Sequence, residues 1–166
     1  MQAVLKTSAG EITIDLDAEA APITVKNFVQ YAKDGHYDGT IFHRVIKSFM
    51  IQGGGFQPDM TQKKTRGQIK NESTNGLGNL KYTIAMARTN VPDSATSQFF
   101  INTKDNFSLD RKTCQDGVGY CVFGQVSKGS EVVDAIESVK TTRVAGHSDV
   151  PAETIEILSV EIIEPK

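Results

Sequence analysis

The segment with the greatest chemical potential runs over residues 42–54 and reads FHRVIKSFMIQGG. In a strand, alternation sends Phe42, Arg44 and Ile46 to one face and the side chains between them to the other. An arginine among large apolar groups is costly unless its guanidinium has partners or a task. Two interpretations follow. Arg44 is either a surface residue that leans its aliphatic stem on apolar neighbours, or a positively charged fork of donors held for a substrate.

Other catalytic groups are scarce in this sequence. His43 is interpreted as a hydrogen-bonded core residue, because a lone histidine on an inward strand face is seldom an acid or a base. The chain contains no G-x-S-x-G, no H-E-x-x-H and no Gly-rich loop that ends in Lys-Ser or Lys-Thr. Gly53-Gly54-Gly55 lacks the lysine of a phosphate-binding loop and predicts a turn with positive φ or close backbone contact. With no Cys/His cluster either, we expect chemistry without cofactor or metal.

Two later segments complete the set of candidate residues. AMAR, residues 85–88, ends one apolar run and opens a polar loop, and SQFFIN, residues 97–102, follows it. Each segment alone is typical of a core strand. Their combination with residues 42–54 is what indicates a functional site.

The elements that must carry these residues are mostly short strands. Ile12, Ile14 and Leu16 alternate with polar residues, and Ser-Ala-Gly joins them to residues 3–7, which predicts a hairpin. From residue 40 onward, short β-branched or aromatic runs are separated by Gly, Asn, Pro and Asp. These runs are IFHRVI, FMIQ, YTIAMA, SQFFIN, YCVFGQV and the terminal TIEILSVEII.

Two helices are expected among the strands. The first starts at Pro22 and continues at helical spacing until Gly35, and the second runs from Ser130, as N-cap, to Lys140. Many short strands with only two helices predict an all-β barrel or sandwich whose open ends the helices cover. Residues 53–79 and 103–119 are expected to be long, irregular and functional loops.

Length and composition predict one domain over residues 1–166. A net charge of −2, with both signs spread along the chain, gives no indication of a nucleic-acid or membrane partner. The N-terminus lacks the apolar region of a signal peptide, and no window reaches the length of a membrane span. We therefore expect a cytoplasmic protein, a monomer by default, in which Cys114 and Cys121 are free thiols.

Four motifs occur in a fixed order, namely FHRVIKSFMIQGGG, AMAR, SQFFI and GYCVFGQV. In this order and at these distances they resemble the cyclophilin family of peptidyl-prolyl cis-trans isomerases, and most of all its short bacterial cytoplasmic members. The resemblance extends from the opening hairpin to the last strand. It implies a closed, eight-stranded antiparallel barrel capped by two α-helices, with a substrate groove on the outer surface. It also implies activity on proline-containing peptides and on unfolded or folding proteins.

The resemblance also assigns roles to individual residues. By motif position Arg44, Gln52 and Phe49 match the catalytic residues, and Phe49 also belongs to the walls of the proline pocket. The remaining matches are to substrate-binding positions in the pocket and groove: Met50, Phe100, Leu109, Ala87, Arg88, Gln98, Phe107 and Tyr120. Phe107 stands where the eukaryotic members carry tryptophan, Tyr120 where they carry histidine, and Arg88 where they carry asparagine. Since the family's tight cyclosporin binding depends on that tryptophan, we expect weak cyclosporin binding here.

Two rival functions are compatible with parts of the pattern. The same groove would serve as a module that only binds proline-containing segments, although pure binding needs the apolar pocket and not Arg44 or Gln52. A barrel that holds a small ligand inside is the other rival. The abundance of bulky inward-type residues argues against an empty interior.

Overall fold

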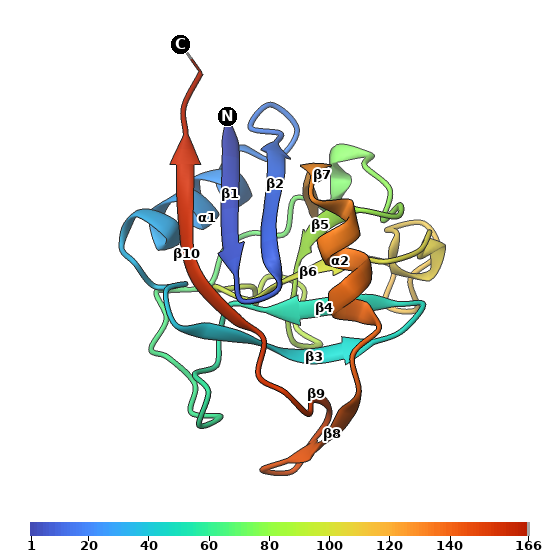
Figure 1. Cartoon of the computed structure of the whole chain (residues 1–166). Coiled ribbons are helices and arrows are strands. Elements are labelled where there is room, and N and C mark those ends of the chain that lie inside the picture. The colour runs from blue at the N-terminus through green and yellow to red at the C-terminus, as the bar shows by residue number, and fades with distance from the viewer. Residues whose placement is uncertain (166) are drawn as a thin grey trace.

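Eight antiparallel strands close into a barrel in the computed structural model, which describes residues 1–165 (Figure 1). The order around the barrel is β1, β10, β3, β4, β6, β5, β7 and β2, and each neighbouring pair is hydrogen-bonded. Their bounds are β1 Gln2–Thr7, β2 Gly10–Leu16, β3 Thr40–Ile46, β4 Met50–Gly53, β5 Thr83–Met86, β6 Phe99–Asn102, β7 Val122–Lys128 and β10 Glu156–Ile163. The predicted eight-stranded barrel is confirmed.

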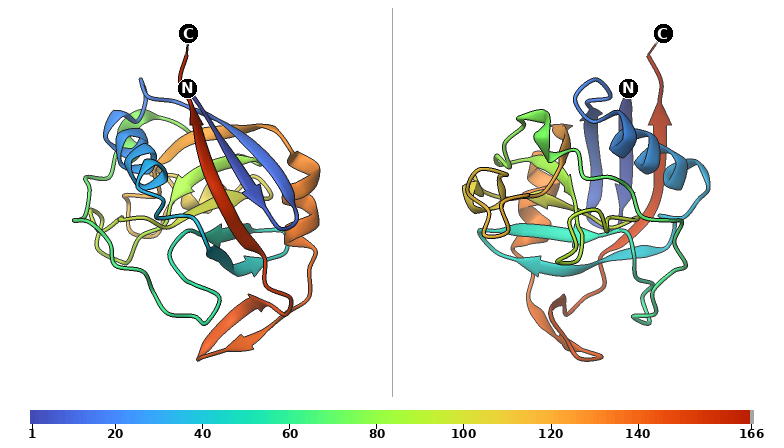
Figure 2. Two further views of the ribbon diagram at one scale, coloured as in Figure 1. Left: turned by 60° about the vertical axis from the view of Figure 1, so that its left-hand side comes forward. Right: turned by 180° about the vertical axis from the view of Figure 1, so that it is seen from behind.

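The helices α1 (Pro22–Lys33) and α2 (Ser130–Glu137) lie on opposite sides of the barrel (Figure 2). Proline opens α1 as predicted, because its fixed φ suits the first helical turn. The expectation that Ser130 caps α2 is wrong. Gly129 is the N-cap, with φ of 88°, and a Cβ there would lie 2.2 Å from the Glu11 carbonyl oxygen. The close approach of α2 to β2 therefore requires a glycine at this position.

Side chains fill the barrel, and aromatic rings are prominent among them. Phe28 of α1 contacts Tyr37, Phe99 and Phe123 at ring-centroid distances of 5.2, 5.7 and 5.3 Å. All four are fully buried. An eight-stranded barrel is just wide enough for side chains to fill it, so this packing gives no support to a ligand held inside.

A β-bulge interrupts β3 at the residues of greatest interest. Phe42 pairs with Gly53 and Arg44 with Gln52, so that His43 is the extra residue of the bulge. The bulge breaks the alternation of side chains. Phe42 and Val45 both enter the core, while Arg44 is exposed on the outer surface. The prediction that Phe42 and Arg44 share a face is therefore wrong.

His43 is buried, but not as the predicted hydrogen-bonded core residue. Its ring lies 4.4 Å from that of Phe56 and 6.5 Å from that of His147, between ring centroids. Within residues 1–165, its Nδ1 has no hydrogen-bond partner. The interpretation of His43 as a satisfied core histidine is corrected accordingly.

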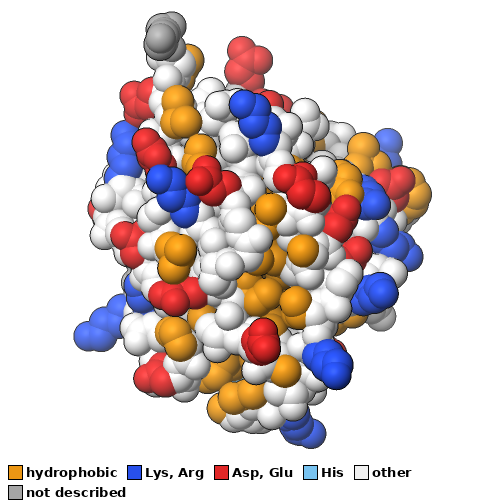
Figure 3. Space-filling view, in the orientation of Figure 1, with side chains coloured by type: hydrophobic (Ala, Val, Ile, Leu, Met, Phe, Trp, Pro, Cys, Tyr) orange, Lys and Arg blue, Asp and Glu red, His pale blue; other side chains and the backbone are white. Residues whose placement is uncertain are grey.

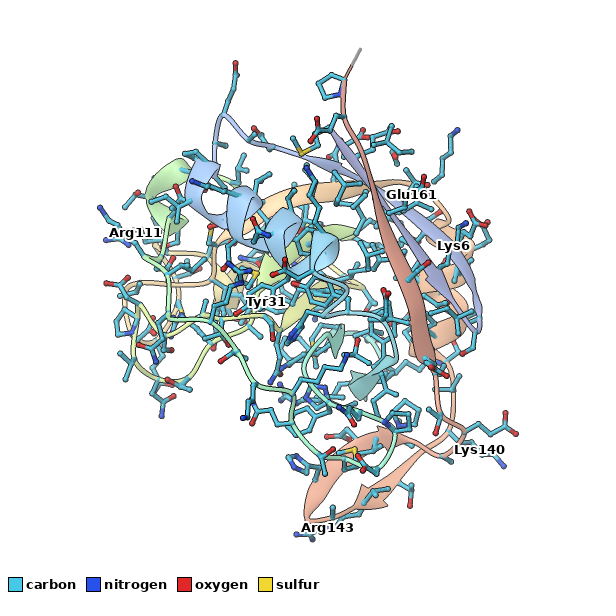
Figure 4. The ribbon with its side chains drawn as sticks, turned by 90° about the vertical axis from the view of Figure 1, so that its left-hand side faces the viewer. Lys6, Tyr31, Arg111, Lys140, Arg143 and Glu161 are labelled. Atoms are coloured by element: carbon cyan, nitrogen blue, oxygen red, sulfur yellow. The ribbon has the colours of Figure 1, made fainter. Side chains whose placement is uncertain are left out.

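A second sheet of two strands, β8 (Thr141–Val144) and β9 (His147–Pro151), projects from the barrel next to β3. Arg143 of this hairpin points away from the barrel (Figure 4). Tyr31 of α1, in contrast, is buried between the helix and the barrel. The sequence pattern does not predict this hairpin, because every residue of β8 is exposed and its sequence has no apolar alternation.

The long loops contain only two short 3₁₀ helices within the described residues, η1 (Ser73–Asn75) and η2 (Phe107–Leu109). Cys114 and Cys121 are free thiols, as expected. Across residues 1–165, no helix is both long and apolar enough to cross a membrane.

Candidate active site

A small cavity of about 120 Å³ opens on the outside of the barrel. Its nine lining residues all belong to the predicted site: Arg44, Phe49, Met50, Gln52, Ala87, Arg88, Phe100, Leu109 and Tyr120. A cavity of about 150 Å³ holds a benzene ring. This cavity is therefore of the right size for one five-membered ring.

Strand register places the central residues of the cavity side by side. Arg44 of β3 pairs with Gln52 of β4, Gln52 pairs with Phe100 of β6, and Phe100 pairs with Ala85 of β5. These four residues form one row across the sheet. Local pairing within four adjacent strands therefore fixes how far apart the backbones of Arg44 and Phe100 lie.

The cavity walls belong to an apolar cluster separate from the barrel core. Met50, Ala85, Phe100 and Val122 are its buried members. Partly buried residues pack around them: Ile46, Phe49, Leu77, Ala87, Leu109 and Tyr120. Since the barrel core lies on the opposite side of the strands, this cluster can accept an apolar ring from solvent while the fold stays intact.

Two glutamine side chains connect Arg44 to the groove. Arg44 Nη1 donates to Gln52 Oε1 at 3.4 Å, and Gln52 Nε2 donates to Gln98 Oε1 at 3.0 Å. Gly55 makes room for this arrangement, because a Cβ at residue 55 would lie 2.5 Å from Gln98 Cγ. Gln98 does not line the cavity itself but adjoins it through this hydrogen bond.

The two arginines at the cavity differ in what their charge can do. Arg44 is exposed and makes no salt bridge with any of residues 1–165. The Arg88 side chain is 2% exposed and pairs with Asp116, Nη2 to Oδ2 at 2.6 Å. The N–H groups of Val118 and Gly119, and then Arg88, hold the pKa of Asp116 well below its ordinary value. Arg44 is therefore the arginine whose donors are available to a bound molecule.

Residues that the sequence analysis did not identify hold the 103–119 loop against the cavity. Asn106 Nδ2 donates to the Phe49 carbonyl and to Asn102 Oδ1, both at 2.8 Å, and Asn102 donates to Asn79 at 3.1 Å. All three asparagines are buried. The signal for them is a polar residue at the end of an apolar strand, as in FFIN, because a buried amide needs partners.

The structure does not bring Phe107 into the cavity. Its side chain is 59% exposed and lies at a separate hollow of about 470 Å³, next to Leu77 and Arg111. The predicted groove position of Phe107 is therefore not a contact with the cavity in this conformation.

Larger hollows lie elsewhere on the molecule. One of about 700 Å³ lies between the β1–β2 turn and the end of α2, on the face where Figure 3 shows apolar side chains gathered. Another, of about 510 Å³, is lined by Leu77, Leu80 and three acidic residues. Size alone would favour these hollows, but neither has an arginine or an aromatic side chain in its lining.

The cavity suits non-covalent chemistry. None of its nine lining side chains is a thiol, an imidazole, a carboxylate or a serine hydroxyl. No group of three or more His, Cys, Asp and Glu side chains that could hold a metal ion occurs within residues 1–165. The arrangement offers instead an apolar slot with a guanidinium and an amide at its edge, which can bind a ring and donate hydrogen bonds beside it.

Comparisons with known proteins agree with this geometry. The family model described as cyclophilin type peptidyl-prolyl cis-trans isomerase/CLD matches residues 3–162. Peptidyl-prolyl cis-trans isomerase cyp18 of Streptomyces antibioticus is 58% identical over 96% of this chain and 96% of its own. Peptidyl-prolyl cis-trans isomerase B of Escherichia coli is 53% identical over 95% of this chain and 97% of its own.

Solved structures show the same barrel. A cyclophilin-type isomerase of Cryptosporidium parvum superposes with a TM-score of 0.84 at 26% identity, covering 99% of this chain and 98% of that one. The same protein in the presence of the dipeptide Ala-Pro gives a TM-score of 0.81 at 24% identity, covering 99% of this chain and 100% of that one.

Proposed function

Because the chain belongs to the cyclophilin-type peptidyl-prolyl cis-trans isomerase family, we propose that the cavity beside Arg44 is where it catalyses rotation about X-Pro bonds. The chain is an isomerase of this kind, and its relatives at 52–58% identity carry that name. The observation that supports the site is an arginine without a salt bridge to any described residue, at the edge of an apolar cavity large enough for one ring.

The reaction needs no covalent intermediate. Rotation about an X-Pro bond crosses a barrier of about 18–20 kcal/mol because amide resonance is lost as the bond twists. In the twisted state the proline nitrogen becomes pyramidal and gains a lone pair. A guanidinium beside that nitrogen donates to the lone pair, which the planar ground state hardly offers. The interaction exists mainly in the transition state, and such an interaction raises kcat.

The apolar walls hold the proline ring while the preceding carbonyl group turns. Met50 and Phe100, which are 2% and 4% exposed, line the slot together with the partly buried Leu109 and Tyr120. A bound ring displaces water from the slot, which lowers the local polarity and strengthens a hydrogen bond from Arg44.

Gln52 has a double role in this proposal. Its Oε1 accepts from Arg44 and its Nε2 donates to Gln98, so that its amide orients the guanidinium and is itself oriented. Ala87 and Gln98 would flank the peptide backbone on either side of the proline. Arg44, Gln52 and Phe49 remain our catalytic residues.

The substrates we propose are proline-containing peptides and unfolded or folding proteins. The Cryptosporidium relative was determined in the presence of Ala-Pro, a minimal X-Pro dipeptide, and a slot for a single ring suits that class. We further propose that residues 1–166 act as one domain and as a monomer in the cytoplasm, with no nucleic-acid or membrane partner. Sedimentation of the purified chain would test the monomer.

The deciding experiment measures isomerisation of a short X-Pro peptide by the wild-type chain and by Arg44→Ala. Loss of one preorganised donor costs about 10²–10³ in kcat, and we expect a loss near the lower value because Arg44 is exposed. Glu164→Gln is the matched control, since it breaks the Lys33–Glu164 surface pair, whose side chains are 53% and 59% exposed. Full activity of Arg44→Ala would show that catalysis takes place elsewhere on the molecule and that the cavity at most binds the peptide.

A further inference from the structure

An ion pair between the buried side chain of Arg88 and the partly exposed Asp116 lies at one wall of the cavity. Arg88 Nε and Nη2 both donate to the Gly119 carbonyl, at 3.1 and 2.7 Å, and Nη1 donates to the Thr89 carbonyl at 2.9 Å. Nη2 also donates to Asp116 at 2.6 Å. These four hydrogen bonds occupy most of the five N–H groups of the guanidinium. Arg88 therefore has little capacity left for a substrate.

The same guanidinium stacks on a residue that lines the cavity. Its Cζ lies 4.3 Å from the centroid of the Tyr120 ring, which is within cation–π distance. Tyr120 also meets Phe100 edge-on, at 5.7 Å between centroids and 80° between planes. Tyr120 thus contacts both Arg88 and the aromatic wall of the cavity.

Asp116 ties this arrangement to the long loop. Its Oδ1 accepts from the N–H groups of Val118 and Gly119 at 2.9 and 3.1 Å, while Oδ2 accepts from Arg88. Directly after Gly119, the Tyr120 N–H donates to the Leu109 carbonyl at 3.0 Å. The hydrogen bonds of Asp116 therefore influence the positions of two residues that line the cavity, Tyr120 and Leu109, although Asp116 itself does not line it.

We infer that Asp116, Arg88 and the Gly119 carbonyl form a brace that positions Tyr120, and that this brace determines how tightly the proline ring is held. The inference rests on the proposed function of the cavity. Arg88, predicted to be a substrate-binding residue, is then a positioning residue that acts through Tyr120. Only an arginine can do this, because a lysine lacks the planar fork needed to stack and to reach Gly119 and Asp116 together.

The brace should affect substrate binding more than turnover. Tyr120 contacts the ring in the planar and the twisted state alike, so its displacement weakens both states equally. A change of this kind raises KM and leaves kcat nearly unchanged. Loss of Arg44, in contrast, lowers kcat. This difference separates the two roles in one set of kinetic data.

The test is a double-mutant cycle between Asp116→Asn and Tyr120→Leu, read as kcat and KM for a short X-Pro peptide. The Asp116→Asn substitution keeps a side-chain oxygen for the two loop N–H groups and replaces Oδ2, the charged acceptor that holds Arg88, by a neutral NH2 group. We expect it to raise KM about fivefold to tenfold with little change in kcat. In the Tyr120→Leu background the same change should have no further effect. Arg88→Lys should reproduce the rise in KM, and Glu164→Gln should not.

Two outcomes would overturn the brace. One is an unchanged KM in Asp116→Asn and Arg88→Lys, even with a lower melting temperature, which would make the ion pair purely structural. The other is an equal rise in KM on Asp116→Asn whether residue 120 is tyrosine or leucine, which would mean that Asp116 does not act through Tyr120. Phe100→Ala distinguishes failure of the site itself: if that variant keeps full activity the cavity is not the active site, whereas its inactivity beside an unaffected Asp116→Asn refutes the brace alone.

Discussion

We expect acidification to destabilise the fold through His43, as tested by replacing it with glutamine. Burial, and after it the charges of His147 and Arg44, lower the pKa of His43 from 6.5 to about 4. The unfolded chain takes up a proton on this imidazole near pH 6.5, whereas the folded chain keeps it neutral until about pH 4. The stabilisation is therefore complete above about pH 6.5 and is lost as the pH falls toward 4.

The size of the effect follows from the difference between the two pKa values. A difference of about 2.5, at 1.36 kcal/mol for each unit, corresponds to about 3 kcal/mol in the free energy of unfolding. About 2 kcal/mol of this should be lost by pH 5. The structural cause is visible around the ring: Phe56 packs against it at 4.4 Å with the planes tilted by 45°, and an N–H on the buried Nδ1 has no hydrogen-bond acceptor within residues 1–165.

Urea unfolding at pH 7 and pH 5 measures the effect in the wild type and in His43→Gln. The variant will be less stable at pH 7, because it loses the contact with Phe56, but its stability should change less with pH. Between pH 7 and pH 5 we expect the free energy of unfolding to fall by about 2 kcal/mol more in the wild type than in the variant. Because other titrating groups are common to both chains, they cancel in this comparison. Equal losses would refute the reasoning, since His43 would then titrate alike in the folded and unfolded chains.

Three further predictions concern catalysis, the fold and a ligand. Arg44→Lys should lose most of kcat and keep KM within about threefold, because lysine keeps the charge but not the fork that Gln52 orients; equal losses in peptide binding and turnover would contradict the role. Gly129→Ala should lower the free energy of unfolding by about 3 kcal/mol or more, measured in urea, because its φ of 88° and the 2.2 Å approach to Glu11 exclude a Cβ; a wild-type midpoint would contradict this. Cyclosporin should bind weakly by calorimetry, because Phe107 offers no indole N–H, and affinity equal to that of tryptophan-bearing relatives would refute it.

Much of the barrel could be predicted because its signals are local. Each barrel strand is a short apolar run with its own turn residues, and Pro22 and Gly35 mark the limits of α1 in the sequence. Except for Leu109, which lies in the 103–119 loop, the residues that line the cavity lie in the same runs or directly beside them. A motif that fixes a strand therefore also fixes which side chains reach the cavity.

The wrong or missing predictions from the sequence share one physical cause, because in each case a segment distant in the sequence determines the local structure. The bulge at His43 reverses the alternation after Phe42, and nothing in the neighbouring residues themselves announces it. Gly129 replaces Ser130 as N-cap because β2 passes too close for a side chain. The exposed hairpin β8–β9 is held by pairing and by the buried Val150, not by alternation.

The same limit applies to the two arginines, and here it bears on the mechanism. Arg44 and Arg88 each follow apolar strand residues, and each lines the cavity. What separates them is Asp116, 28 residues beyond Arg88 in a loop that the sequence leaves irregular. Asp116 neutralises the guanidinium of Arg88, which is buried and stacks on Tyr120. Among the described residues that line the slot, Arg44 is therefore the one positive charge without an ion-pair partner. A twisting imide then meets one donor group instead of two competing ones, and the bulge in β3 is what turns that group outward to meet it.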